Sequence, residues 1–173
     1  AVGRDALKCN VGGTSNTAVG ESALCKNTTG TQNTALGVSA LPSNTTGWQN
    51  TSIGFASLNQ NTTGRYNVAI GAYALRCNTT GRLNVAIGRM AMINNLTGIR
   101  NTALGTRALA CNEACSSLVA VGYKALSAST TGILNTAVGY QALRSNTYGK
   151  CNTALGHNAL NINTTGNDNT AVG

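Results

Sequence analysis

The sequence predicts an all-β fold: a parallel β-solenoid of ten coils, with one coil for each seventeen-residue repeat. A glycine recurs at every seventeenth residue from Gly3 to Gly173, without insertion or deletion. A leucine column, interrupted only by Met92, follows four residues after each glycine. Seventeen residues are too few for two helices of about eleven residues each, and Asn, Thr and Gly are poor helix formers. The repeats are therefore expected to stack as short β coils along one axis.

The consensus repeat, A-[VIL]-G-x-x-A-L-x-x-N-T-T-G-x-x-N-T, contains one clear strand. In the segment 67–71, alternation places Val68 and Ile70 on one face and Ala69 on the other. We expect the Val/Ile/Leu position and the leucine column to point inward as continuous ladders, and the pair Ala74-Leu75 to form a second short strand. The Asn-Thr-Thr-Gly word is typical of a turn whose glycine adopts a positive φ.

Two asparagine columns run through the repeats, and stacked asparagines can hydrogen-bond along a column as amide ladders do. We therefore expect these residues to cap turns and form ladders. The first column comprises Asn10, Asn27, Asn44, Asn61, Asn78, Asn95, Asn112, Asn146 and Asn163. The second comprises Asn16, Asn33, Asn50, Asn67, Asn84, Asn101, Asn135, Asn152 and Asn169.

Residues 1–173 are predicted to be a single repeat array without separate domains. The sequence begins with Ala-Val-Gly and stops with the same three residues at the same phase of the period, without a polar cap. We expect a window from a longer fibre whose open sheet edges favour self-association, as a homo-oligomer or filament. No run of eighteen apolar residues occurs, so no membrane span is predicted in this segment.

Charged residues make up only 9% of the chain, with a net charge of +8. The twelve lysines and arginines fall in variable positions around the repeat, and no column is basic in every unit. This spread favours solvated outward positions over a dedicated polyanion groove, and no nucleic-acid partner is expected.

The segments 67–71 and 84–88, both Asn-Val-Ala-Ile-Gly and each followed after two residues by an alanine, resemble the head repeats of YadA-like trimeric autotransporter adhesins. The motif of that family is close to S-V-A-I-G-x-x-A. Similar N-T-A-x-G arrays occur in phage tail-fibre-like proteins. The resemblance implies a left-handed parallel β-roll in which three chains form an adhesive head. The period here is longer than the usual period of that family because of the added N-T-T-G word.

The sequence contains no pattern typical of a catalytic or metal site, so an enzyme is not expected and no cofactor is predicted. The one histidine, His157, lies in a variable position. The four acids Asp5, Glu21, Glu113 and Asp168 lie on four different coils, and no pair has the spacing for acid–base chemistry.

Seven asparagines begin N-x-S/T sequons and are candidate glycosylation sites on turns expected to be exposed. The same asparagine persists in repeats without a sequon, so the residue also serves the turn. The candidates are Asn27, Asn44, Asn50, Asn61, Asn78, Asn95 and Asn163.

Six cysteines indicate an oxidising compartment. Cys9 and Cys25 lie sixteen residues apart, nearly one coil, so we expect a disulfide between them. A second is expected between Cys111 and Cys115, within one degenerate coil. The remaining two, Cys77 and Cys151, are either free or paired between chains.

The sequence favours an extracellular or cell-surface fibre with a structural or adhesive role, whose partners are further copies of the chain and a surface glycan or host receptor. Two alternatives are a receptor-binding phage-type tail fibre and an ice-binding module. Adjacent threonines point to opposite sides of the chain, so the Thr-Thr pair of the turn suits ice binding less well than a T-x-T word.

Overall fold

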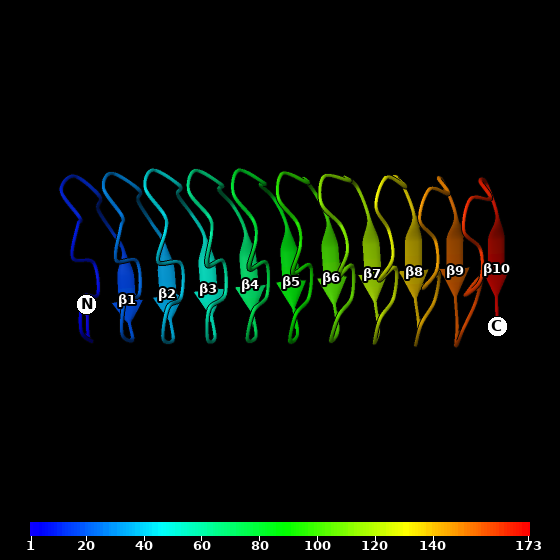
Figure 1. Ribbon diagram of the computed structural model, residues 1–173, viewed down its shortest axis with the longest axis horizontal. Helices are drawn as coiled ribbons and strands as arrows, with labels where there is room; N and C mark the ends of the chain where they lie inside the picture. The colour runs from blue at the N-terminus through cyan, green and yellow to red at the C-terminus, as the bar shows by residue number, and fades with distance from the viewer.

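The computed structural model describes all residues 1–173 as a straight rod of coils, with the two chain ends at opposite ends of the rod (Figure 1). Ten three-residue strands form one parallel sheet in chain order, and the register is one repeat throughout, so that Thr17 lies opposite Thr34. The predicted parallel β-solenoid is confirmed. The structure contains no helix that could span a membrane. The strands are β1 (Thr17–Val19), β2 (Thr34–Leu36), β3 (Thr51–Ile53), β4 (Val68–Ile70), β5 (Val85–Ile87), β6 (Thr102–Leu104), β7 (Val119–Val121), β8 (Thr136–Val138), β9 (Thr153–Leu155) and β10 (Thr170–Val172).

The central alanine of each strand, and not the Val/Ile/Leu position, points into the interior in nearly every coil. This corrects the predicted orientation of the strands. In β4, Ala69 is fully buried, whereas Val68 and Ile70 point outward and are only half buried. In β2, Thr34 and Leu36 are exposed on either side of the buried Ala35. The alternation itself was read correctly, but its two faces were assigned the wrong way round. The coil interior is too narrow for a second row of branched side chains opposite the leucines.

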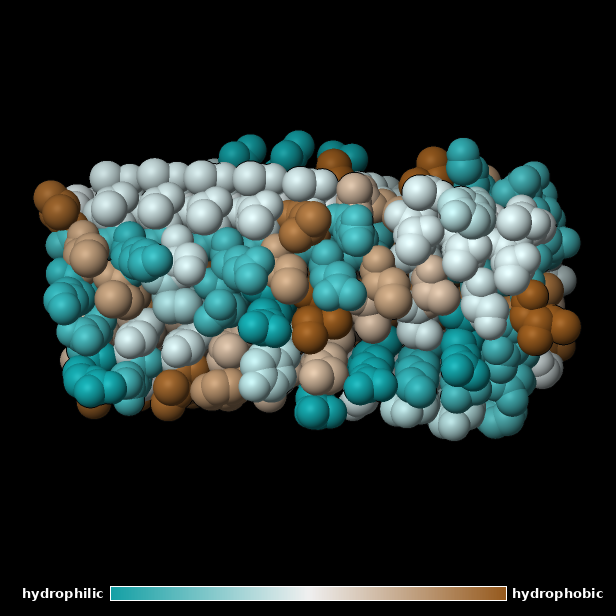
Figure 2. All heavy atoms as spheres, in the orientation of Figure 1, coloured by the Kyte–Doolittle hydropathy of each residue, from teal (hydrophilic) through white to brown (hydrophobic).

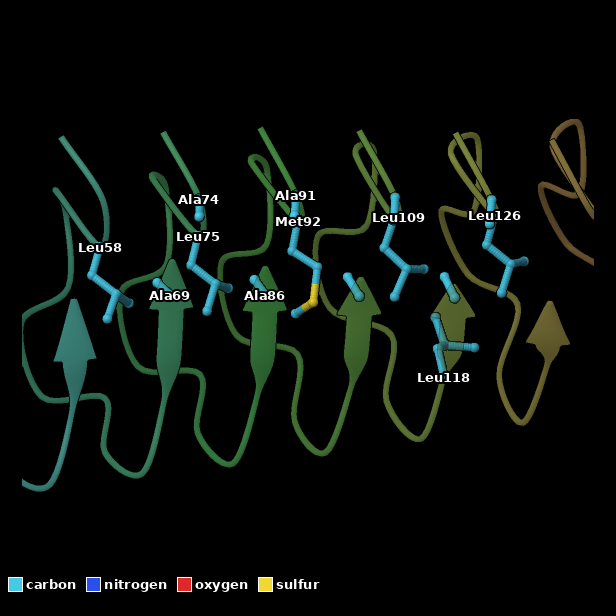
Figure 3. Close-up of a cluster of buried hydrophobic side chains, with 14 of the residues drawn as sticks. Leu58, Ala69, Ala74, Leu75, Ala86, Ala91, Met92, Leu109, Leu118 and Leu126 are labelled. Atoms are coloured by element: carbon cyan, nitrogen blue, oxygen red, sulfur yellow. The ribbon is translucent and has the colours of Figure 1, made fainter. Parts of the chain in front are cut away.

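The leucine column fills that interior, as predicted. Leu58, Leu75, Met92, Leu109 and Leu126 form a row with one residue from each coil (Figure 3), and all five are fully buried. The residue before each of these five is also buried: it is Ser57 before Leu58 and, in the other four coils, an alanine such as Ala74 that packs into the same cluster.

No second strand forms at the Ala-Leu pair, because the chain turns there through left-handed backbone conformations. Each complete coil has three non-glycine residues with positive φ, such as Tyr73 (61°), Leu75 (49°) and Leu83 (60°). This conformation costs about 1 kcal/mol per residue in isolation. In the stack, each of these three N–H groups donates to a carbonyl of a neighbouring coil, at 2.9–3.1 Å. Stacking therefore stabilises turns that a single coil could not hold.

Two glycine columns have different physical roles. The glycine after each strand has a positive φ, for example 124° at Gly71, a conformation that other residues resist. The glycine of the Asn-Thr-Thr-Gly word does not, contrary to the prediction. At Gly64 a side chain is excluded by space, because a Cβ atom would collide with the Asn61 side chain and the Gly81 carbonyl.

Coil-to-coil hydrogen bonds extend well beyond the sheet. Of 117 backbone hydrogen bonds, 18 lie within the strands, and many of the other 99 join neighbouring coils through their turns. Thr28, for instance, donates its N–H to the Thr45 carbonyl at 3.0 Å. The whole perimeter of each coil therefore contacts the next one.

We expect Leu75→Asp to destabilise the rod severely, because it places an unpaired charge in a fully buried apolar row. The neighbouring substitution Arg76→Asp, at an exposed position, is the matched control and should leave the melting temperature nearly unchanged. Thermal unfolding followed by circular dichroism measures both. Equal melting temperatures for the two variants would contradict the inward placement of the leucine column.

Candidate functional site

The first asparagine column forms a continuous hydrogen-bonded ladder over coils 1–7, here called the turn ladder, which confirms the predicted role of these residues. Asn61 donates from Nδ2 to Asn44 Oδ1 (3.0 Å) in the preceding coil and to Gly64 O (3.1 Å) in its own turn. Its own Oδ1 accepts from Asn78 Nδ2 (2.7 Å). Each central amide thus makes three hydrogen bonds without water.

The second column, here called the strand ladder, lies immediately before the strands. Asn67 donates two hydrogen bonds to Asn50 Oδ1, one from its backbone N–H and one from Nδ2, both at 3.1 Å. Nδ2 also donates to the carbonyl of Gly81, at 2.9 Å. That same carbonyl accepts from Asn78 of the turn ladder at 3.1 Å. The turn glycines therefore join the two ladders into one network inside the rod.

The burial of these ladders corrects the expectation that the sequon asparagines lie on exposed turns. Asn27, Asn44, Asn50, Asn61, Asn78 and Asn95 are at most 1% exposed, while Asn163 in the last coil is half buried. The Nδ2 atom that a glycan would occupy donates to the neighbouring coil and to a glycine carbonyl. In the folded rod the six buried amides have no room for a glycan.

A matched pair of substitutions separates the ladder from the sequon. Asn61→Ala removes three buried hydrogen bonds and leaves the Asn44 and Asn78 amides short of a partner, so we expect a loss of about 2 kcal/mol or more. Thr63→Ala destroys the same sequon at an exposed residue and should cost far less. Chemical denaturation measures both free energies of unfolding. Comparable losses would contradict a structural role for the amide.

Both ladders are interrupted in the same part of the rod. Ser129 replaces the asparagine of the turn ladder, and its buried hydroxyl has no hydrogen-bond partner. Leu118, fully buried, replaces the asparagine of the strand ladder. Cys115, three residues before Leu118, stands in the turn-glycine column and donates its thiol S–H to the Thr130 carbonyl at 2.8 Å. Burial raises the pKa of this thiol, which keeps it protonated.

The two predicted disulfides are wrong in this structure, in which all six cysteines are free. Cys9 and Cys25 lie in adjacent coils and share a backbone hydrogen bond of 3.0 Å, but their side chains belong to different columns of the repeat. Cys111 is exposed while Cys115 is buried, and the Cys115 thiol donates to the Thr130 carbonyl. The exposed or half-buried Cys77 and Cys151 are also unpaired.

The outward face of the sheet carries two parallel columns of side chains that run along the whole rod. One column contains threonine or valine and the other contains valine, leucine or isoleucine, and neither contains a charged residue. Several members of the second column are substantially exposed, among them Leu36 (46%), Leu104 (43%) and Leu155 (38%). This surface, here called the outer sheet face, is flat, uncharged and largely apolar.

Aromatic residues stack on one another beside this face. Tyr123, Tyr140 and His157 each follow the glycine after a strand, and their rings are parallel to within 21° at 5.1–5.4 Å. The Lys124 ammonium lies over the Tyr123 ring, 5.2 Å from its centroid. The sole histidine is thus held in a stack of rings.

Most positive charge has no acidic partner. The only ion pairs join Arg4 to Glu21 and Lys8 to Asp5, both in the first two coils. Side chains of mixed hydropathy cover the face of the rod visible in Figure 2. On the turns after β6, β7 and β8, a shallow groove of about 480 Å³ brings Arg144 together with Arg107 and Lys124, which share one column of the repeat. It is lined by Arg107, Ala110, Cys111, Lys124, Ser127, Ala128, Arg144, Ser145 and Thr147.

No group of three or more His, Cys, Asp or Glu side chains could hold a metal ion. The candidate functional surfaces are therefore the outer sheet face and the cationic groove. No protein-family model, no curated protein and no solved structure matches this chain.

Proposed function

We propose that this chain is a segment of an extracellular structural and adhesive fibre, in which copies associate laterally through the outer sheet face. The observation that carries the proposal is the continuous, uncharged pair of columns on that face. Monomeric proteins rarely expose an apolar surface that extends the length of the molecule. A second copy of the same chain is the occupant that the face fits best, because it offers the same flat surface with the same period.

The size of the face supports this occupant. Ten coils at about 4.8 Å make a face about 48 Å long, and three-residue strands make it about 10 Å wide. Pairing two such faces buries close to 1,000 Å² in total, near the lower limit for a specific interface. The exposed Phe55, Tyr123 and Tyr140 at its margin add further apolar area.

The interior of the rod is suited to resist tension along the rod axis. Buried amide ladders and coil-to-coil backbone bonds run along the rod axis, so an axial pull acts against many hydrogen bonds at once. The likeness of the repeats to adhesin heads, in which three chains pack together, supports the same function. We therefore expect a multimer of parallel rods.

Light scattering coupled to size exclusion tests the proposal. The parent chain should elute as a multimer, and the double substitution Ile70→Lys and Ile87→Lys should reduce it to a monomer, because charges one coil apart prevent the faces from pairing. Both side chains point outward, so circular dichroism should be unchanged.

The matched control places two lysines at the same one-coil spacing on exposed turn residues, as Thr63→Lys and Thr80→Lys. This variant should stay multimeric. A parent chain that is monomeric at all accessible concentrations would refute lateral association. So would equal dissociation of the two lysine variants.

One observation favours ice binding as a second candidate. Threonines such as Thr17, Thr34 and Thr51 repeat at one coil spacing on the outer sheet face, beside the valine, leucine or isoleucine column. A rigid, uncharged array of this kind can order water. Thermal hysteresis in the monomeric fraction of the parent chain, lost in the Ile70→Lys and Ile87→Lys variant, would favour this candidate over the fibre.

A further inference from the structure

We propose that the cationic groove formed by Arg107, Lys124 and Arg144 binds an acidic polysaccharide, one that carries carboxylate or sulfate groups. This inference rests on the adhesive part of the proposed function and extends it by naming the class of ligand. The groove lies on turns after β6, β7 and β8 and thus spans three successive coils.

The repeat geometry creates this charge cluster from two columns. Arg107 and Lys124 both lie two residues after a strand-terminal glycine, so their backbones are about 4.8 Å apart along the axis. Arg144 lies five residues after the equivalent glycine of the next coil, and the tight left-handed turn brings that position onto the same side. Three cations therefore follow one another along the rod, as an extended anionic chain requires.

None of the three cations forms an ion pair. The rod's only salt bridges lie in the first two coils, and between residues 107 and 147 the sole acid is Glu113, which does not line the groove. Arg107 and Arg144 are exposed, and Lys124 is held half buried against the Tyr123 ring. A guanidinium presents paired N–H donors that match the oxygens of a carboxylate or similar oxyanion. The groove is therefore ready to accept anionic groups without first breaking internal pairs.

The other lining groups suit a sugar better than a nucleic acid. Ser127, Ser145 and Thr147 supply hydroxyls that can exchange hydrogen bonds with sugar hydroxyls. Binding of single-stranded nucleic acid relies on aromatic faces on which bases stack. No aromatic residue lines the groove, and the nearby Tyr123 and Tyr140 present their faces to each other and to neighbouring side chains.

Binding of a heparin oligosaccharide, measured by isothermal calorimetry at physiological salt, tests the assignment. The groove variant Arg107→Gln, Lys124→Gln and Arg144→Asn replaces each cation by a residue type that the same column carries in another coil, at Gln141 and Asn161. The fold should therefore be preserved. We expect at least about a tenfold loss of affinity, which corresponds to three solvent-exposed charge contacts.

The matched control removes three exposed cations from another part of the rod, as Arg65→Thr, Arg82→Thr and Arg100→Gln. It changes the net charge equally and should lose less than about threefold by general attraction alone. Equal losses in the two variants would overturn the groove, because they would assign binding to the overall charge. Absence of heparin binding by the parent chain would overturn it as well.

Two further measurements separate the competing explanations. Tighter binding of a single-stranded oligonucleotide than of heparin, lost in the groove variant, would overturn the polysaccharide assignment. The monomeric Ile70→Lys and Ile87→Lys variant is titrated in parallel. Retained heparin binding by that variant supports the groove whatever the fate of lateral association, and a multimer that does not bind heparin refutes the groove alone.

Discussion

The hydrogen bond between equivalent asparagine amides of successive coils is the interaction on which the rest of this structure depends. A buried amide that found no partner would cost about 1–3 kcal/mol, and the two ladders place two such amides in most coils. Each amide is satisfied only because the next coil offers the same group one repeat away, as Asn44, Asn61 and Asn78 do for one another. The strict seventeen-residue period follows, since one inserted residue would bring an amide opposite a group that cannot pair with it.

The same interaction explains why the repeat degenerates in a concerted way around residues 113–131. A Cβ atom in the turn-glycine column collides with its own turn asparagine, the next glycine carbonyl and the asparagine amide of the next coil. Cys115 occupies that column where the next turn residue is Ser129, which has no amide to collide with it. The serine therefore removes one of these three contacts at Cys115, and it also breaks the turn ladder.

The stacking, the register, the buried leucine column and the hydrogen-bonded asparagine ladders followed from the sequence, because a period without gaps leaves few ways to arrange equivalent residues, but the burial of the asparagines did not. Which side of each strand faces the interior did not follow from the sequence. Alternation separates Ala69 from Ile70 but does not say which is inside, and the narrow coil accommodates only the smaller side chain opposite Leu75. The left-handed leucine turns and the cationic groove also escaped prediction, since both depend on the path of the chain between columns. Arg107 and Arg144 occupy different columns, so only the folded turn places them together.

Amide hydrogen exchange at single residues tests the ladder account most directly. The backbone N–H groups of Asn50, Asn67 and Asn84 each donate to the side-chain oxygen of the preceding asparagine, at 3.0–3.1 Å. The equivalent backbone N–H of Asn135 lies opposite Leu118, whose side chain has no hydrogen-bond acceptor. Asn135 and Leu118 are both fully buried. We expect Asn135 to exchange at least about tenfold faster than the other three, which corresponds to the loss of one hydrogen bond of about 1.4 kcal/mol. Equal exchange rates at all four amides would contradict the claim that the asparagine ladders hold the coils together.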